Sequence, residues 1–197
     1  MPSDKPMIPP KAKQGNIHDE KDKDIHHPNA PVSVPKHHGT EQDTTNDSPS
    51  HTDLGIFALP PFERAVRCIK YYERWHDIKR NYPYIGWGHR ILPHEKFKKN
   101  LTCHQADSLL RSDLTKLCAM FRMYGKDSLL LAVLAYNVGP YKILGNRRFT
   151  KSRLLLRIER GLRNIEKDYL DFCRWRGKYI QSIRRRRMTE FQLLYIP

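Results

Sequence analysis

The chain has 197 residues, of which 39% are hydrophobic and 29% charged, and its formal net charge is +15. Residues 1–53 hold six Lys, no Arg, seven Asp and two Glu and so sum to −3, which leaves +18 on the remainder. The longest apolar run, 128–136, is far below the roughly 20 residues that cross a bilayer, so a membrane span is not expected. No secretory signal is visible at the start, so the sequence shows no export route.

Residues 1–53 are predicted to form a disordered polar tail. They contain no Phe, Trp, Tyr or Cys and eight of the fourteen prolines. Such a segment cannot bury enough apolar surface to offset the entropy lost on ordering. Its six histidines could bind a metal, but a polar linker is the favoured interpretation. Order is expected to begin near Leu54.

A helix is predicted to follow Pro60 and Pro61, because proline fits the first helical turn, where it has no amide hydrogen to lose. Apolar residues then follow at steps of four and three, which is the period of a helix face: Phe62, Val66 and Ile69. Glu73 continues this stripe, four residues after Ile69. A carboxyl group is therefore expected at the end of an otherwise apolar face.

A tight hairpin is predicted over residues 82–91, where aromatic and β-branched residues surround two glycines. Thr102 and Gln105 form a capping-box pattern that opens a second helix, which Gly125 is expected to end. Asp127 is expected to cap a third helix, 128–137, which is apolar nearly all round and so buried. Further helices are predicted at 154–158, 165–175 and 182–196.

The four cysteines give no zinc signature, because none lies in a C-x-x-C pair: Cys68, Cys103, Cys118 and Cys173. An even count fits one or two disulfides in an exported protein. Separate buried thiols fit equally well.

Three segments together resemble the phage-type lysozymes, the endolysin branch of the lysozyme superfamily. The first is Glu73 at a helix end, followed by the hairpin Ile85-Gly86-Trp87-Gly88-His89. The second is Leu101-Thr102-x-x-Gln105-Ala106-Asp107-x-Leu109-Leu110-x-x-Asp113-Leu114, and the third is Arg186-Arg187-x-x-Glu190. The chain as a whole also resembles the lysozyme-type proteins of some conjugative elements.

A fourth segment is similar to the A-Y-N-x-G-P signature of lytic transglycosylases: Ala135-Tyr136-Asn137-Val138-Gly139-Pro140. Those enzymes share the lysozyme-like core and attack the same glycosidic bond. They close the sugar into an anhydro ring instead of adding water.

The resemblance implies an α+β, lysozyme-like fold over residues 54–197, with a mainly helical lobe, a small β-hairpin lobe and a cleft between them. It also implies cleavage of the β-1,4 bond between N-acetylmuramic acid and N-acetylglucosamine. Glu73 would protonate the leaving oxygen, since breaking a glycosidic bond needs a proton there. Burial against the preceding apolar stripe would penalise the charged form and keep this acid protonated, as in lysozymes. Tyr84, Gly86, Trp87, His89 and Asn137 would line the sugar site.

Two departures from the family pattern affect the expected mechanism. Tyr84 occupies the position of the usual Thr, and no Asp lies some nine residues after Glu73. Asp77 is the nearest carboxylate and the candidate helper, because at i+4 on the same helix it would neighbour Glu73. The missing Asp adds weight to substrate-assisted chemistry that uses the sugar's own N-acetyl group.

Several roles have alternatives. His89 could be catalytic, although a tie between the hairpin and the helical lobe is favoured. Asn137 could bind a sugar, cap a helix, or do both. Arg184 to Arg187 fit a cationic face that meets wall polymers, a solvated face, or a nucleic-acid patch.

Two rivals to the enzyme come from other classes: a non-catalytic peptidoglycan-binding protein and a DNA-binding accessory factor. The favoured interpretation is a monomeric enzyme that acts on peptidoglycan glycan strands in the periplasm or outside the cell. No nucleic-acid partner is expected, and no metal or organic cofactor is implied.

Overall fold

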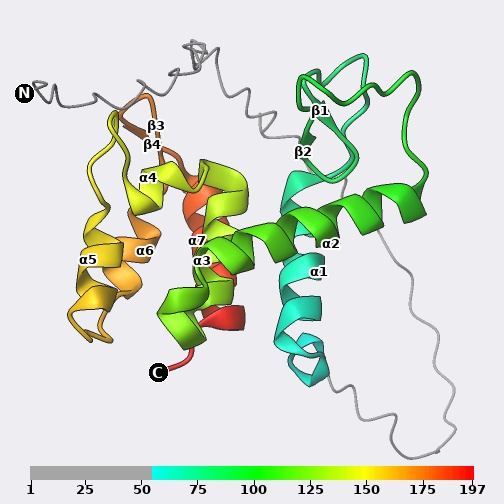
Figure 1. Ribbon diagram of the computed structural model, residues 1–197. Helices are drawn as coiled ribbons and strands as arrows, with labels where there is room; N and C mark the ends of the chain where they lie inside the picture. The colour runs from blue at the N-terminus through cyan, green and yellow to red at the C-terminus, as the bar shows by residue number, and fades with distance from the viewer. Residues whose placement is uncertain (1–54) are drawn as a thin grey trace, which may run out of the picture. The chain divides into compact units, whose positions relative to one another are not determined.

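The computed structural model describes residues 55–197 (Figure 1). The predicted disordered tail lies outside these residues. In chain order the elements are η1 (Ile56–Ala58), α1 (Pro61–Glu73), β1 (Tyr84–Ile85), β2 (His89–Arg90), α2 (Cys103–Met120), η2 (Arg122–Asp127), α3 (Ser128–Val138), α4 (Tyr141–Leu144), α5 (Arg153–Glu159), α6 (Glu166–Leu170), β3 (Arg174–Trp175), β4 (Lys178–Tyr179) and α7 (Gln181–Leu194).

The first two long helices begin where the sequence predicts. Helix α1 starts with Pro61 at its first position and ends at Glu73, after which Arg74 adopts a positive φ of 57°. Helix α2 opens with the predicted capping box, in which Thr102 and Gln105 each bond the other's backbone amide. Helix α2 ends at Met120, and Gly125 lies beyond it in η2 with a positive φ.

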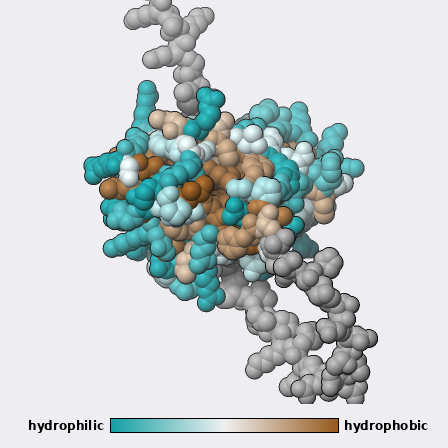
Figure 2. Space-filling model, turned by 90° about the horizontal axis from the view of Figure 1, so that it is seen from below, coloured by the Kyte–Doolittle hydropathy of each residue, from teal (hydrophilic) through white to brown (hydrophobic). Residues whose placement is uncertain are grey.

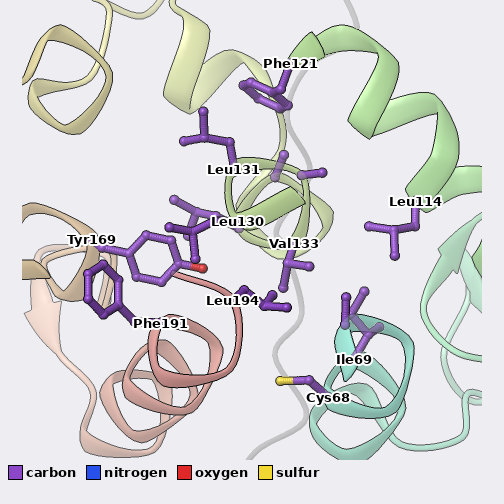
Figure 3. Packing of buried hydrophobic residues seen from close by; sticks show 14 of the residues in the cluster. Cys68, Ile69, Leu114, Phe121, Leu130, Leu131, Val133, Tyr169, Phe191 and Leu194 are labelled. Atoms are coloured by element: carbon purple, nitrogen blue, oxygen red, sulfur yellow. The ribbon is translucent and has the colours of Figure 1, made fainter. Parts of the chain in front are cut away.

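Helix α3 is the centre of the core. Its residues 130–135 are all buried, and it packs against α1, α2 and α7. In Figure 3, Leu130, Leu131 and Val133 of α3 are surrounded by side chains from other helices, among them Ile69, Leu114, Tyr169, Phe191 and Leu194. The nearly all-apolar pattern of α3 is explained by this position, since every face of the helix meets protein.

The small sheets are two separate hairpins. Strands β1 and β2 pair antiparallel at the end of α1, as Figure 1 shows, and an isolated bridge joins His76 to Gly86. Two backbone hydrogen bonds form this bridge, from His76 N to Gly86 O at 2.8 Å and from Gly86 N to His76 O at 3.0 Å. The bridge fastens the segment that follows α1 onto the hairpin. Strands β3 and β4 form the second hairpin, directly before α7.

Three local predictions were wrong. The predicted helix 165–175 ends at Leu170, and its last residues instead form β3, because the segment turns back at Gly177, which has a positive φ. Asp127 precedes α3 without a side-chain capping bond, since its carboxylate binds Arg163 at 2.6 and 2.9 Å. Asn137 is inside α3, and Gly139 is the C-cap.

One face of the molecule, shown in Figure 2, has hydrophobic surface in its middle and hydrophilic side chains around it. All four cysteines are free; Cys68 and Cys173 are buried and Cys103 is exposed. Among the described residues, no helix has the length and apolar character needed to cross a membrane.

Candidate active site

Glu73 is the last residue of α1, and its side chain is 16% exposed. It faces the turn between β1 and β2: a Cβ placed on Gly88 would stand 3.1 Å from Oε2 of Glu73 and 3.2 Å from its Cγ. Gly88 also has a φ of +90°, which disfavours any larger residue. The absence of a side chain at Gly88 therefore leaves room for the carboxyl group beside the hairpin.

The carboxyl group of Glu73 is held by polar partners. Arg186 of α7 donates from Nη1 to Oε1 at 2.7 Å, and Asn137 of α3 donates from Nδ2 to the same oxygen at 3.5 Å. The sequence predicted that the apolar stripe of α1 would enclose this acid. The structure instead places an ion pair between Glu73 and Arg186 there. Protonation of Glu73 would remove this ion pair.

Arg186 belongs to a buried network built on the R-R-x-x-E segment. Its Nε donates to Oε1 of Glu190 at 2.7 Å, and Arg187 and Tyr169 both donate to Oε2 of Glu190. Burial by itself would lower the pKa of the Arg186 guanidinium, but the charges of Glu73 and Glu190 outweigh burial and raise it. Arg186 is therefore a permanent cation beside Glu73.

Aromatic side chains surround the hairpin turn. The ring of Trp87 meets that of Trp75 edge to face, with centroids 5.1 Å apart, and Lys70 Nζ lies 5.5 Å from the Trp87 ring. The backbone carbonyl of Trp87 accepts a hydrogen bond from the Tyr136 hydroxyl at 3.0 Å. Trp75 is 37% exposed. The pair thus presents apolar ring surface close to Glu73, a type of surface on which the C–H face of a sugar can lie.

Two further predicted site residues belong to the hairpin: Tyr84 lies in β1, and Gly86 opens the turn. Gly86 is buried, and a Cβ there would stand 2.8 Å from the Cβ of Ala106, so this glycine permits close packing on α2. Tyr84 is partly buried in β1. Burial raises the pKa of Tyr84, Arg90 opposes that effect and Glu73 adds to it. Glu73 and Tyr84 are therefore electrostatic neighbours.

His89 forms the predicted tie between the hairpin and the helical part. Its side chain is only 6% exposed; Nδ1 lies 2.5 Å from Asp113 of α2 and Nε2 lies 2.8 Å from Glu95. Burial lowers the pKa of His89, but Asp113 and Glu95 more than compensate and raise it. Both ring nitrogens are therefore engaged by carboxylates.

Asp77 does not neighbour Glu73 on one helix, because α1 ends at Glu73. Its carboxylate accepts hydrogen bonds from the backbone amides of Lys79 and Arg80, at 2.9 and 3.3 Å, and from the Asn100 side chain. The Asn100 bond is the largest of the effects that lower the pKa of Asp77. This carboxylate stabilises the turn in which it lies.

Sequence reasoning missed the partners of Glu73. It identified Arg186 and Glu190 as a family signature but gave neither a contact with the acid, since 113 positions separate Arg186 from Glu73. It also missed Trp75. The only available signal for Trp75 was an aromatic residue two positions after the acid. No group of three His, Cys, Asp or Glu side chains that could hold a metal occurs within residues 55–197.

Comparisons with known proteins show the family and the fold. The phage lysozyme family matches residues 70–190. One similar solved structure is the endolysin of Escherichia coli O157:H7 phage FAHEc1, with a TM-score of 0.52 and 18% identity over 74% of this chain and 94% of that one. Another is the muramidase domain of SpmX from Asticaccaulis excentricus, with a TM-score of 0.53 and 21% identity over 68% of this chain and 95% of that one.

No curated protein sequence matches the chain. The two structural neighbours share its fold, a mainly helical α+β arrangement with a small hairpin, as the sequence predicted. The family match covers more than half of the chain and includes Glu73, both glycines of the hairpin turn and the R-R-x-x-E segment. The chain therefore belongs to the phage lysozyme family, a membership that supports a lysozyme-like action on peptidoglycan.

Proposed function

We propose that this protein is a glycosidase that cleaves the β-1,4 bond between N-acetylmuramic acid and N-acetylglucosamine, with Glu73 as the general acid. The observation that carries the proposal is a single fixed carboxyl group. Glu73 ends α1, is mostly buried, is held on one oxygen by Arg186 and Asn137, and turns its other oxygen toward Gly88. A positioned acid of this kind is what protonation of a leaving glycosidic oxygen requires.

The surrounding residues fit the same reaction. Trp75 and Trp87 offer ring surface on which a sugar can lie, and Asn137 offers an amide close to the reacting acid. His89 and Asp113 would hold the hairpin in place. The substrate is then a peptidoglycan glycan strand, met in the periplasm or outside the cell.

The direct test is digestion of purified peptidoglycan sacculi by wild type and by Glu73→Gln. The variant removes the proton and keeps the shape, and loss of a general acid costs about 10²–10⁴-fold in rate. Glu63→Gln is the matched control, because Glu63 lies on the same helix and also binds an arginine, Arg111 at 2.5 Å, on the surface. Undiminished digestion by Glu73→Gln would remove this residue from the mechanism.

A specific observation favours a second candidate, a lytic transglycosylase acting on the same bond. The carboxylate of Asp77 is already used by its own turn and by Asn100, so it is poorly placed to activate water. In the transglycosylase reaction Glu73 still protonates the leaving oxygen. The bond between C1 and the leaving oxygen breaks, the C6 hydroxyl of the muramic acid bonds to C1, and its proton returns to the Glu73 carboxylate, so that no water is added. Mass spectrometry separates the two, since the anhydro product is lighter by one water.

A non-catalytic wall-binding protein is the remaining alternative. It would bind sacculi without releasing soluble sugars. The buried network that holds Glu73 argues for chemistry, because a binding cleft alone would not need a carboxyl group fixed by an arginine and an asparagine.

A further inference from the structure

Among residues 55–197, the most buried charged side chains lie behind Glu73. The Glu190 side chain is fully buried, as is that of Arg187, while that of Arg186 is 7% exposed. Taking such groups out of water costs several kcal/mol for each ion, and a set of apolar residues often gives equal or better stability. Core stability is therefore a weak explanation for this cluster, and its contacts point to another role.

Two chains of contacts run from Glu190 to Glu73. In the first, Oε1 of Glu190 accepts from Nε of Arg186, and Nη1 of Arg186 donates to Oε1 of Glu73, both at 2.7 Å. In the second, Oε2 of Glu190 accepts from Arg187, Arg187 donates to Oδ1 of Asn137, and Nδ2 of Asn137 approaches Oε1 of Glu73 at 3.5 Å. Both chains end on the same oxygen of Glu73.

We propose that Glu190 is a positioning residue, which acts through Arg186 and through the Arg187–Asn137 pair to fix the orientation and the charge balance of Glu73. The proposal rests on the proposed function. The two chains occupy Oε1, so that Oε2, the oxygen beside Gly88, carries the proton that reaches the glycosidic bond. Glu190 is not a catalytic residue, because its side chain is fully buried and out of reach of a substrate.

Charge counting shows why Glu190 matters for a general acid. With Glu73 ionised, the four buried charges sum to zero; with Glu73 protonated, one positive charge is in excess. Without Glu190, both arginines would face Glu73 alone and would resist its protonation more strongly. Glu190 therefore offsets part of the positive charge that the two arginines place around Glu73.

The cysteine and tyrosine side chains around this cluster stay neutral in the working range. On the Glu190 side, burial raises the pKa of the Cys68 thiol to about 12 and raises the pKa of Tyr169 and of Tyr72. On the Glu73 side, burial raises the pKa of Tyr136 and of Tyr84. The more distant Asp113, which adds to the raised pKa of Tyr136, is bound to His89.

Removing a negative charge from the cluster and removing a positive charge from it are expected to shift the pH dependence of activity in opposite directions. The rate of a general acid falls on the alkaline side, where the acid loses its proton. Glu190→Gln removes a negative charge, so this alkaline limb is expected to move to lower pH by about one unit. At pH values above the limb, the rate would then be about tenfold lower than that of wild type. Arg187→Gln removes a positive charge and is expected to move the limb up.

The experiment measures the initial rate of sacculus digestion from pH 4 to pH 9 at constant ionic strength for wild type and the two single variants. It also includes the double variant Glu190→Gln/Arg187→Gln, which removes one charge of each sign and is expected to bring the limb back near the wild-type position. Asp127→Asn is the matched control: it breaks another buried ion pair, with Arg163, and should lower stability without moving the limb.

Every outcome bears on the proposal. Opposite displacements of the limb, with recovery in the double variant, support it. An unmoved limb in folded Glu190→Gln overturns it, and so do displacements of the same sign in all variants, which indicate a structural role alone. If Glu190→Gln does not fold, Arg187→Gln decides by the direction in which its limb moves. If wild type digests nothing at any pH, the proposed function fails, and a ¹³C NMR titration of the Glu73 carboxyl group in the same variants still tests the charge balance.

Discussion

Removal of the Asp113 carboxylate, as Asp113→Asn, is expected to destabilise the protein in a pH-dependent manner. Nδ1 of His89 lies 2.5 Å from Asp113, and the two side chains are 6% and 19% exposed. A hydrogen bond to a charged group contributes about 1.5–3 kcal/mol, and Glu95 still holds the other ring nitrogen in the variant. We therefore expect a loss of about 2 kcal/mol near pH 6, or a fall in Tm of about 4–8 °C for a chain of this size.

The sign of the pH dependence follows from the direction of the pKa shift. The pKa of His89 is raised in the folded state, because Asp113 and Glu95 outweigh burial. Its contribution to stability is thus fully present below the unfolded pKa of about 6.5 and is lost as the pH rises through the higher folded pKa. The pKa of Glu95 is lowered, so its contribution is lost only under acid conditions. The penalty of Asp113→Asn should therefore shrink between pH 6 and pH 9.

Thermal unfolding followed by circular dichroism at pH 6 and pH 9 measures this difference. Asp107→Asn is the control, because Asp107 lies on the same helix but binds Lys70 and Arg111, whose charges do not change over this range. Its penalty should be equal at the two pH values. If Asp113→Asn lowered the stability equally at both pH values, or did not lower it at all, the stabilising interaction between His89 and Asp113 would be refuted.

Three further substitutions test the site. Gly88→Ala places a methyl group 3.1 Å from Oε2 of Glu73 at a φ of +90°, so digestion should fall at least tenfold and stability by about 1–2 kcal/mol, as rate assays and unfolding can show. Trp75→Ala should raise KM for soluble glycan fragments about fivefold with little change in kcat, since only sugar contact is lost; an unchanged KM would exclude it from the sugar site. Asp77→Asn should keep its lytic activity, because that carboxylate serves its own turn, and abolished lysis would return it to the mechanism.

Elements with a strong local pattern were predictable from the sequence. The stripe that ends at Glu73 gave α1, the Thr102–Gln105 pair gave the start of α2, and the apolar run gave the buried α3. The small hairpin and its tie through His89 followed from the glycines and from the histidine beside them. In each case the signal lies within a few neighbouring positions.

The environment of Glu73 was not predictable in the same way. Arg186 reaches it from 113 positions along the chain, and no local periodicity reports such a contact. The apolar stripe of α1 predicted the burial of one side of the acid, whereas the polar partners come from α3 and α7. The second hairpin was missed because its aromatic and basic residues also suit a helix, and only the turn at Gly177 decides between the two.

The most direct test of Glu73 as the proton donor compares two substrates in one variant. Glu73→Gln is assayed on natural glycan strands and on an aryl glycoside of a muramic-acid oligosaccharide, whose leaving group departs without a proton. This role of Glu73 predicts a loss of about 10²–10⁴-fold on the glycan strands and a much smaller loss on the aryl glycoside. Equal losses on both substrates would contradict it.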